Sequence, residues 1–436
     1  MAGLVLLAGG LAAGIWFYPT RSTSASAGHE KAAAAAPATR YVVPNGSDSS
    51  NSCTNAGRPC RTFNHAYQQA RPGDVIEIGG GTYPRQTIRS SPNKLHATQN
   101  VLFRPAPGAI VNVNGTLTMY GSHAVFQGGK NPYTFRIKYL NNWVDRMRTR
   151  SNHVTYENLD GRNFSIGPAA YITIRGGDWG PANTAKGDDE NVITPDGNHI
   201  RDEPSHIVLD GLLIHHQQSS NLRRHHQGGL MLVGGGSITI RNTTFVKNVV
   251  YDIEVGGFNG AKNPHHVTLE NNVFGAPVTG LGQGAVRNDG QAEVQLQPGD
   301  RTYAGKRNGY HDWLVRYNSF RNGFAPRFDG PAAFYRNFRV LANTGDAQTC
   351  QRGIVYRYNA WSDGRCGTTD RRIGRLPYTS SSLGSENFHL RSGTRAQNIV
   401  PRSAAKPGSG LGLAHDIDGG LRPCGTGYDA GSDERC

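Results

Sequence analysis

The 436-residue sequence lacks the short motifs of several large classes of protein. No G-x-x-x-x-G-K-[ST] segment is present, which argues against a phosphate-binding loop, and no G-x-S-x-G segment, which argues against a serine-hydrolase elbow. The six cysteines include no C-x2-C pair, which argues against a structural zinc site. We therefore expect neither a nucleotide cofactor nor a nucleic-acid partner.

Lysine and acidic residues are scarce beside arginine. Only nine of the 46 basic residues are Lys and 37 are Arg, against 32 Asp and Glu, so the net charge is +14. The planar Arg side chain pairs bidentately with carboxylate, sulfate or phosphate. An acidic partner is one interpretation, and a general bias toward Arg that aids solubility is the other.

Long apolar runs are also scarce, and the clearest one is at the N-terminus. Residues 2–18 are apolar and uncharged, and the small residues A-S-A follow at 25–27. This pattern predicts a signal peptide over residues 1–27 and an Ala-rich linker over 28–39, so we expect a secreted, extracellular protein. An uncleaved anchor is the alternative, but 17 residues are few for a bilayer span.

The six cysteines fall into three locally spaced pairs, and their even number supports export. Sequence alone cannot choose among the possible connectivities. Short loops favour the disulfides 53–60, 350–366 and 424–436.

One eight-residue pattern recurs along the chain: apolar, any, apolar, polar, turn, small or turn, any, apolar. Copies begin at Ile172, Ile207, Ile238, Val267, Trp313 and Ile354, and weaker copies begin at Val101, Ala124 and Val154. The steps between starts range from 18 to 46 residues. Repeats of about 20–50 residues are typical of solenoids and propellers.

Each copy has the chemistry of a strand followed by a corner. Its first half alternates inward and outward side chains, and the Asn or Gly residues that follow tolerate a left-handed backbone. No copy is long enough for an amphipathic helix, and regular Asn-Gly hairpins, expected in propeller blades, are missing. We therefore predict an all-β fold, a right-handed parallel β-helix in which each coil is stabilised by its neighbours.

The ends of such a stack need caps. Near the N-terminus, four apolar residues share one helical face: Phe63, Ala66, Tyr67 and Ala70. Pro72-Gly73 predicts the end of this capping helix. We place the N-terminal cap at 40–73, the β-helix at 74–376 and an irregular C-terminal capping tail at 377–436.

Three stretches resemble a known family. "CRTFNHAYQQARPGDVIEIGGGTYPRQTI" (60–88) resembles the start of secreted right-handed β-helix proteins of the pectate-lyase-like superfamily. "ENFHLRSGTRAQN" (386–398) and "HDIDGGLRPCGTGYDAGSDE" (415–434) resemble the closing segment of many bacterial members. The superfamily includes polysaccharide lyases, uronate epimerases, glycoside hydrolases and members without a known reaction, so the resemblance implies the fold more than the activity.

The resemblance also implies a groove lined by the strand that precedes the Asn-cornered strand. The corresponding segments here are 198–202, 230–233, 251–255 and 292–296. Alternation predicts these outward side chains: His199 and Arg201, Leu230 and Leu232, Asp252 and Glu254, Glu293 and Gln295.

This surface could support elimination on a uronate chain. Arg201 could neutralise the substrate carboxylate and His199 could act as base. Asp252, Glu254 and Glu293 could bind Ca²⁺ through carboxylate oxygens, and Glu293 could contact substrate. The alternative is a set of ordinary solvated groups on an exposed strand.

A second acidic segment is "KGDDENVITPDGNHIRDE" (186–203). Asp188 and Asp189 could also bind Ca²⁺, although a solvated polar loop is the favoured interpretation because acidic runs usually face water. Lyases with this kind of N-terminus carry a D-D-G-x-D-like calcium motif and a catalytic Lys. "GDDENV" matches that motif in part, and Lys262 is the nearest candidate Lys.

Histidines occur in two patterns. In "HHQQSSNLRRHH" (215–226), four His could bind a transition metal, but Arg223 and Arg224 favour a basic rim that binds a polyanionic substrate. Four other His each precede a predicted strand, which indicates a role at corners: His123, His153, His206 and His266.

Three functions remain open. The first is an extracellular enzyme, a lyase or uronate epimerase, that acts on acidic polysaccharide, with Ca²⁺ as its expected cofactor. The second is a non-catalytic β-helix that binds glycan or a cell surface. The third is a glycoside hydrolase with paired carboxylates such as Asp252 and Glu293. We expect a monomer that is not inserted in the membrane once the signal is removed.

Overall fold

The computed structural model describes residues 36–145, 148–184, 191–197, 199, 201–219, 228–248, 251–257, 260–275, 293–297, 302–303, 306–326, 332–346, 350–382 and 386–436. The predicted signal peptide and most of the predicted linker lie outside these residues. Among them, no helix has the length and apolar character needed to cross a bilayer.

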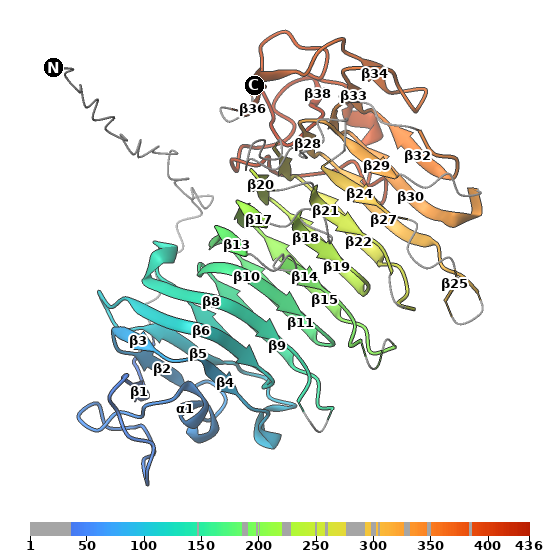
Figure 1. The fold of residues 1–436 in the computed structure, drawn as a ribbon. Helices are drawn as coiled ribbons and strands as arrows, with labels where there is room; N and C mark the ends of the chain where they lie inside the picture. Colours follow the sequence, from blue (N-terminus) through green and yellow to red (C-terminus); the bar gives the residue numbers. More distant parts are fainter. Residues whose placement is uncertain are drawn as a thin grey trace, which may run out of the picture. The chain divides into compact units, whose positions relative to one another are not determined.

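Twelve parallel strands form one sheet, called here the first face (Figure 1). They are β1 (Arg40–Val42), β2 (Val75–Ile78), β5 (Val101–Pro105), β7 (Ala124–Gln127), β9 (Asn152–Glu157), β11 (Ala170–Arg175), β15 (Ser205–Asp210), β19 (Gly236–Arg241), β22 (His265–Glu270), β27 (Tyr310–Arg316), β30 (Tyr335–Leu341) and β32 (Ile354–Arg357). Every predicted copy of the eight-residue pattern begins in a strand of this sheet. The first positions of successive copies pair with one another across the sheet, as in Ile172 with Ile207 and Ile207 with Ile238.

Three of the twelve strands carry no predicted copy: β1 and β2 at the N-terminal end, and β30, which lies between two predicted copies. In β30 the fourth position of the pattern is Leu341, where the other copies carry a polar residue. Leu341 is buried against the C-terminal tail, so an apolar side chain is favourable there.

Two further parallel rows complete each coil. The second face contains β3 (Gly81–Tyr83), β6 (Val111–Met119), β8 (Phe135–Asn142), β10 (Asp160–Ile166), β12 (Asp178–Trp179), β16 (Leu213–His215), β20 (Thr244–Val246), β23 (Val273–Phe274), β28 (Ser319–Phe320), β31 (Thr344–Gly345), β33 (Ala360–Trp361) and β34 (Arg371–Arg372). The third face contains β4 (Gln86–Ile88), β14 (Asn191–Ile193), β18 (Gly228–Leu232), β21 (Tyr251–Val255), β24 (Val294–Leu296) and β29 (Phe324–Pro326). The long strands β6, β8 and β10 belong to both rows. The predicted parallel β-helix is confirmed.

The corner between the first and second faces is built from two residues per coil. The first has a positive φ, as at Asn242 (51°) and Asn271 (57°). In the later coils, from Asn272 onward, the second residue turns an amide inward, and these amides form a hydrogen-bonded column. Asn318 Oδ1 accepts the backbone N–H of Asn272 at 3.0 Å, and its Nδ2 donates to the Leu269 carbonyl at 2.9 Å. The column therefore satisfies backbone groups that the sharp corner leaves without ladder partners.

The column of amides ends on a carboxylate. Asn359 Oδ1 accepts the backbone N–H of Asn343, and Asp370 Oδ1 accepts the backbone N–H of Asn359, both at 2.9 Å. The other oxygen of Asp370 accepts the N–H of Gly367 at 2.9 Å.

The inward side chains form one continuous hydrophobic cluster. Aromatic rings in neighbouring coils lie over one another. Phe103 and Phe126 are 4.6 Å apart between centroids, and Phe126 and Tyr156 are 5.3 Å apart. Such stacks add about 0.5–1.5 kcal/mol per pair beyond burial.

On the outward side of the first face, charges alternate from coil to coil. The partnered residues are Glu157, Arg175, Asp210, Arg241, Glu270 and Arg316, called here the charge column. Arg175 contacts Glu157 at 3.1 Å, and Arg241 contacts Asp210 at 2.9 Å. Arg316 also pairs with Glu270. Opposite charges thus face one another across each described step.

Both ends carry additional structure. The predicted N-terminal helix is confirmed as α1 (Phe63–Gln69), with Thr62 Oγ1 accepting the His65 N–H at 3.1 Å as N-cap. At the other end, Leu390, Val400 and Leu411 of the tail pack against the last coils.

The predicted disulfides Cys53–Cys60, Cys350–Cys366 and Cys424–Cys436 are all present.

The remaining elements are short. They are the parallel pair β13 (Ala182–Thr184) and β17 (Gln217–Ser219), the antiparallel pairs β25 (Thr302–Tyr303) and β26 (Lys306–Arg307), β35 (Tyr378–Ser380) and β36 (Asn387–Leu390), β37 (Val400–Pro401) and β38 (Gly427–Tyr428), and the 3₁₀ turns η1 (Pro92–Lys94), η2 (Pro132–Thr134), η3 (Ala332–Phe334) and η4 (Arg402–Ala404).

Candidate functional site

Three of the four predicted groove segments are strands of the third face: β18, β21 and β24. The predicted outward orientation of Leu230 and Leu232 is wrong, because they are partners of the inward Ile253 and Val255 and lie in the core.

The fourth prediction, a strand at 198–202, is wrong for the described residues His199, Arg201 and Asp202, which lie in turns, while residues 198 and 200 lie outside the described part of the chain. The strand lies at Asn191–Ile193, and Pro195, which has no N–H to donate, follows where the chain leaves the sheet. His199 and Arg201 are exposed in the turn between β14 and β15, and the His199 N–H donates to the Asp196 carbonyl at 2.8 Å.

The predicted carboxylates of the third face point away from the core but are buried. Asp252, Glu254 and Glu293 are at most 2% exposed. Burial raises the pKa of Asp252 well above its ordinary value, although Asn248 donates to it at 2.9 Å. Burial also raises the pKa of Glu293 well above its usual range, and the nearby Asp252 charge adds to this. The alternative of solvated groups on an exposed strand is therefore wrong for these three.

Existing hydrogen bonds decide whether these carboxylates suit Ca²⁺. The N–H groups of Asn322 and Gly323 each donate to Glu293 at 2.7 Å, and Gln297 donates to Glu254 at 3.2 Å. Asp252 Oδ2 is buried without a hydrogen-bond partner among the described residues. Four of the six carboxylate oxygens already accept hydrogen bonds, which leaves fewer than the roughly six to eight ligands that Ca²⁺ requires. The described carboxylates of this face therefore do not fit a Ca²⁺ site by themselves.

The other predicted site residues are spread out. Lys262 is partly exposed in the turn between β21 and β22, on the way to the first face. Asp188, Asp189, Arg223 and Arg224 lie outside the described residues.

The predicted corner position of four histidines is confirmed. His123, His153, His206 and His266 have φ between 53° and 56°. His123 immediately precedes β7, and the other three are the second residues of β9, β15 and β22.

A different cluster lies on the second face. Asp160 of β10 and Asp178 of β12 are partners on neighbouring parallel strands. Arg136 of β8 lies one coil before Asp160, and its Nε is 3.5 Å from Asp160 Oδ2. Burial, followed by the charge on Asp178, raises the pKa of Asp160 to about 6. A carboxyl group with this pKa exchanges its proton readily near neutral pH.

Asp178 also accepts two side-chain hydrogen bonds. The Tyr133 hydroxyl donates to Oδ2 at 2.8 Å, and His215 Nε2 lies 2.6 Å from Oδ1. His215 Nδ1 lies 2.7 Å from Nδ1 of His216. Burial, followed by the charge of His215, lowers the pKa of His216 to about 4, so His216 is neutral in the physiological range. Asp178 thus fixes both Tyr133 and His215 beside Asp160.

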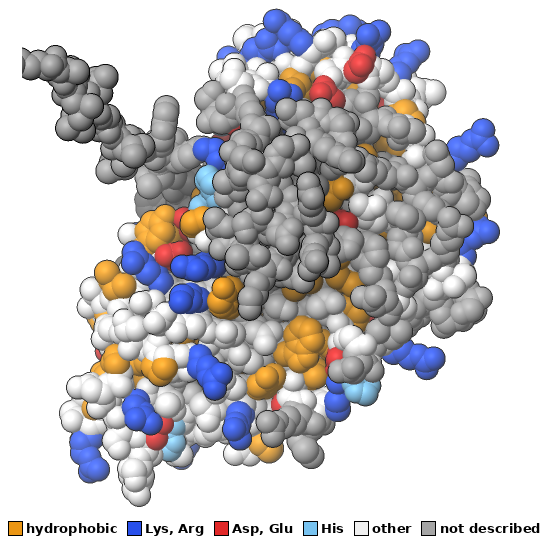
Figure 2. Space-filling model, viewed as in Figure 1, with side chains coloured by type: hydrophobic (Ala, Val, Ile, Leu, Met, Phe, Trp, Pro, Cys, Tyr) orange, Lys and Arg blue, Asp and Glu red, His pale blue; other side chains and the backbone are white. Residues whose placement is uncertain are grey.

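This cluster borders a hollow of about 330 Å³ lined by Asn112, Asn114, Ile137, Lys138, Asp160, Arg162, Gly180 and Pro181. Lys138 and Arg162 are partnered outward positions of β8 and β10, two residues beyond Arg136 and Asp160. Lys and Arg side chains gather over this part of the coil in Figure 2, at the left of the view. The hollow therefore combines cations with one titratable carboxyl group.

Sequence reasoning missed Asp160 and Asp178, although the repeat contained the signal. Both occupy the seventh position of consecutive pattern copies, those that begin at Val154 and Ile172. The pattern does not restrict that position, because its side chain points outward. Aligning it between copies would have paired the two carboxyl groups.

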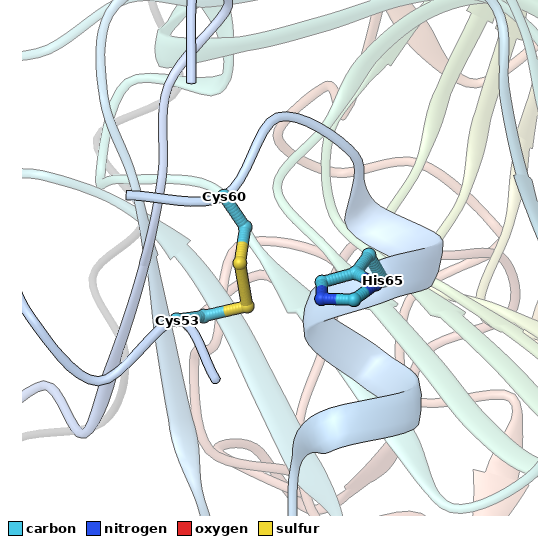
Figure 3. Close-up of side chains that lie close together, drawn as sticks. All are labelled: Cys53, Cys60 and His65. Atoms are coloured by element: carbon cyan, nitrogen blue, oxygen red, sulfur yellow. A yellow bond between two sulfur atoms is a disulfide. The ribbon is translucent and has the colours of Figure 1, made fainter. Parts of the chain in front are cut away.

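Two described groups bring potential metal ligands within 4.8 Å of one another. In the first, Figure 3 shows His65 beside Cys53 and Cys60, whose sulfurs are joined to each other and cannot act as thiolate ligands. In the second, His389 contacts Asp433 at 3.1 Å and Asp418 at 3.4 Å. These contacts form an ion-pair cluster in the C-terminal tail.

No protein-family model matches the sequence, and a comparison with curated proteins finds no relative. Solved structures do match. A crystal structure of pectate lyase Pel9A shares 14% identity and a TM-score of 0.41, covering 92% of this chain and 97% of that one. A rhamnogalacturonan lyase shares 13% identity and a TM-score of 0.31, covering 82% and 97%.

A third match is a mannuronic acid specific polysaccharide family 6 lyase enzyme from human gut microbiota. It shares 13% identity and a TM-score of 0.29, covering 72% of this chain and 85% of that one. All three identities are below 25% and all three TM-scores are below 0.5, so the fold described above rests on the strand pairing and not on these matches.

Proposed function

We propose that the protein is a secreted polysaccharide lyase that acts on uronate units of an acidic polysaccharide at the hollow of the second face. The observation that carries the proposal is Asp160, with a pKa of about 6, beside Lys138 and Arg162 in one open hollow. The three disulfides are typical of proteins in an oxidising, extracellular compartment.

Elimination first requires positive charge beside the uronate carboxylate, and the two cations of the hollow can supply it. The proton beside a uronate carboxylate is weakly acidic, because its removal places further negative charge next to an existing one. Lys138 and Arg162 would bind the carboxylate and stabilise that developing charge. Asn112 and Asn114 line the same hollow and would hydrogen-bond to sugar hydroxyl groups.

Elimination also requires a base that removes the proton, and Asp160 can serve as this base. Its ionised carboxylate would remove the C5 proton, the C4–O bond would break, and a C4–C5 double bond would form. The leaving oxygen would take its proton from water, since the hollow is open. A base with a pKa near 6 is ionised at neutral pH and still strong enough to accept a proton.

Asp178, Tyr133 and His215 would act on Asp160 rather than on substrate. Asp178 raises the pKa of Asp160, and its bonds to Tyr133 and His215 keep its own carboxylate in place. We therefore assign Asp178 as a positioning residue.

The test is to incubate the protein with pectate, alginate and glycosaminoglycans, with and without added Ca²⁺, while following the ultraviolet absorbance of unsaturated products. A rise in absorbance supports elimination. Loss of that rise in Asp160→Asn, and its strong reduction in Lys138→Ala with Arg162→Ala, supports the assignment. Asp363→Asn, a change at an exposed carboxylate, is the matched control.

Other results would overturn the proposal. New reducing ends without a double bond indicate a hydrolase, and inversion at C5 without cleavage indicates an epimerase. Binding without any product indicates a glycan-binding protein. If His199→Ala and Arg201→Ala abolish activity while Asp160→Asn does not, the site belongs to the turns beside the third face.

A further inference from the structure

Residues with positive φ form a column where each coil enters the first face. The column, in order, is His123, His153, Tyr171, His206, Ser237, His266, Asp312 and Asn337, with φ between 51° and 61°. Each coil thus presents one side chain at the same place.

The first four side chains of this column are stacked rings. Ring centroids are 4.7 Å apart between His123 and His153, 4.5 Å between His153 and Tyr171, and 4.4 Å between Tyr171 and His206. Neighbouring ring planes differ by at most 21°. Each inner ring therefore has both of its faces covered by its neighbours.

Ser237 interrupts the stack. Its side chain is too short to cover the face of His206 that points away from Tyr171. The next ring in the column is His266, two coils beyond His206, and it is held by Asp312 at 3.3 Å and by His265 at 2.8 Å. With about 4.8 Å per coil, the space between His206 and His266 is about twice that repeat.

This space is part of a hollow of about 850 Å³ that runs along the column. The described lining residues include no Lys, Arg, Asp or Glu. They are Ala97, Thr98, Asn100, His123, His153, Thr155, Tyr171, Thr173, His206, Val208, Ser237, Thr239 and His266. Its chemistry is therefore hydroxyl groups and aromatic rings, unlike the charged hollow of the second face.

We propose that the gap above Ser237 binds one unit of an uncharged saccharide. A pyranose ring has an apolar C–H face, which would cover the open face of His206, and a rim of hydroxyl groups, which would meet Ser237, Thr239 and the imidazole nitrogens. A sugar chair is thicker than a flat aromatic ring, and two coil repeats give it room between two rings. No residue of this site belongs to the proposed uronate site.

The decisive variant is Ser237→Tyr, which restores the missing ring. The change is compatible with the backbone, because Tyr171 has the same φ of 56° in the same column. Binding is measured by isothermal titration calorimetry with neutral cello-, xylo-, manno- and galacto-oligosaccharides and with oligogalacturonate. We expect a neutral oligosaccharide to bind the native protein, and Ser237→Tyr to weaken that binding at least tenfold without lowering the melting temperature.

Two further variants complete the test. His206→Ala removes the ring that the sugar covers and should weaken binding similarly. Asn337→His adds a ring to the same column beyond the gap and should leave binding unchanged, as should Asp160→Asn on the second face. The proposal is overturned if no neutral oligosaccharide binds, if oligogalacturonate binds more tightly at this gap, or if Ser237→Tyr binds as the native protein does.

Discussion

Asp160 and Asp178 occupy partnered positions on neighbouring strands, and the charge on Asp178 adds to the larger effect of burial in raising the pKa of Asp160. One carboxyl group thereby becomes a better base, while the other is held by Tyr133 and His215. Two residues of the same type acquire different chemistry from their surroundings.

This relationship predicts the effect of Asp178→Asn. The pKa of Asp160 should fall from about 6 toward the ordinary Asp value, without reaching it, because burial remains. Carboxyl-carbon NMR titration would measure the shift, and the acidic limb of any lyase activity should move to lower pH with it. Asp363→Asn should leave the titration where it is, and an unshifted Asp160 in Asp178→Asn would contradict the coupling.

The buried carboxyl group of Asp252 predicts a pH-dependent stability. Because its pKa is raised in the folded protein, the folded state binds this proton more tightly than the unfolded state. Its contribution is therefore greatest below the ordinary Asp pKa and is lost as pH rises through the raised value.

Asp252→Asn should remove this loss. At pH 8 we expect it to raise the free energy of unfolding by more than about 1 kcal/mol, since one pKa unit corresponds to about 1.4 kcal/mol. The gain should disappear below the ordinary Asp pKa, where both side chains are neutral. Denaturant unfolding at the two pH values checks this, and an equal gain at both would argue against a raised pKa.

The column of amides predicts a large cost for Asn318→Ala. The side chain is fully buried and bonds to Asn272, to Asn343 and to the Leu269 carbonyl. Removing it leaves buried partners unsatisfied, which should lower the free energy of unfolding by about 3 kcal/mol. The exposed Asn93→Ala is the matched control, and similar unfolding midpoints for both variants would show that the column contributes little.

The charge column predicts an unusual double-mutant result. Asp210→Ala should cost about 1 kcal/mol at low salt, and less at high salt, because its Arg partners are partly exposed. Exchanging the two members, Asp210→Arg with Arg241→Asp, restores their own attraction but places like charges against Arg175 and Glu270. We therefore expect the exchange to remain less stable than the native protein in thermal unfolding. If the exchanged variant were as stable as the native protein, only the Asp210–Arg241 pair, and not its neighbours in the column, would contribute to stability.

The sequence predicted the coil well because burial restricts what a repeat can contain. Inward positions such as Ile172 and Ile207 must be apolar, and corner residues must accept a positive φ. Both restrictions recur in every coil, so the repeat can be recognised in a single sequence. Leu341 shows the limit, since contact with the tail replaced the polar residue that the pattern required.

The site was harder to predict because outward positions are not restricted by the core. Asp160 and Asp178 became recognisable only when their strands were seen to be neighbours, and Tyr133 reaches them from a separate turn. His199 was assigned to the wrong element because β14 is short and is followed by a turn that also contains apolar residues.

The alternation of the charge column limits how such a chain can change its length during evolution. Loss of a single coil, for example the one that contributes Asp210, would bring Arg175 against Arg241. Loss of two consecutive coils would leave opposite charges together. Along this segment, insertions and deletions of whole repeats should therefore be tolerated in even numbers.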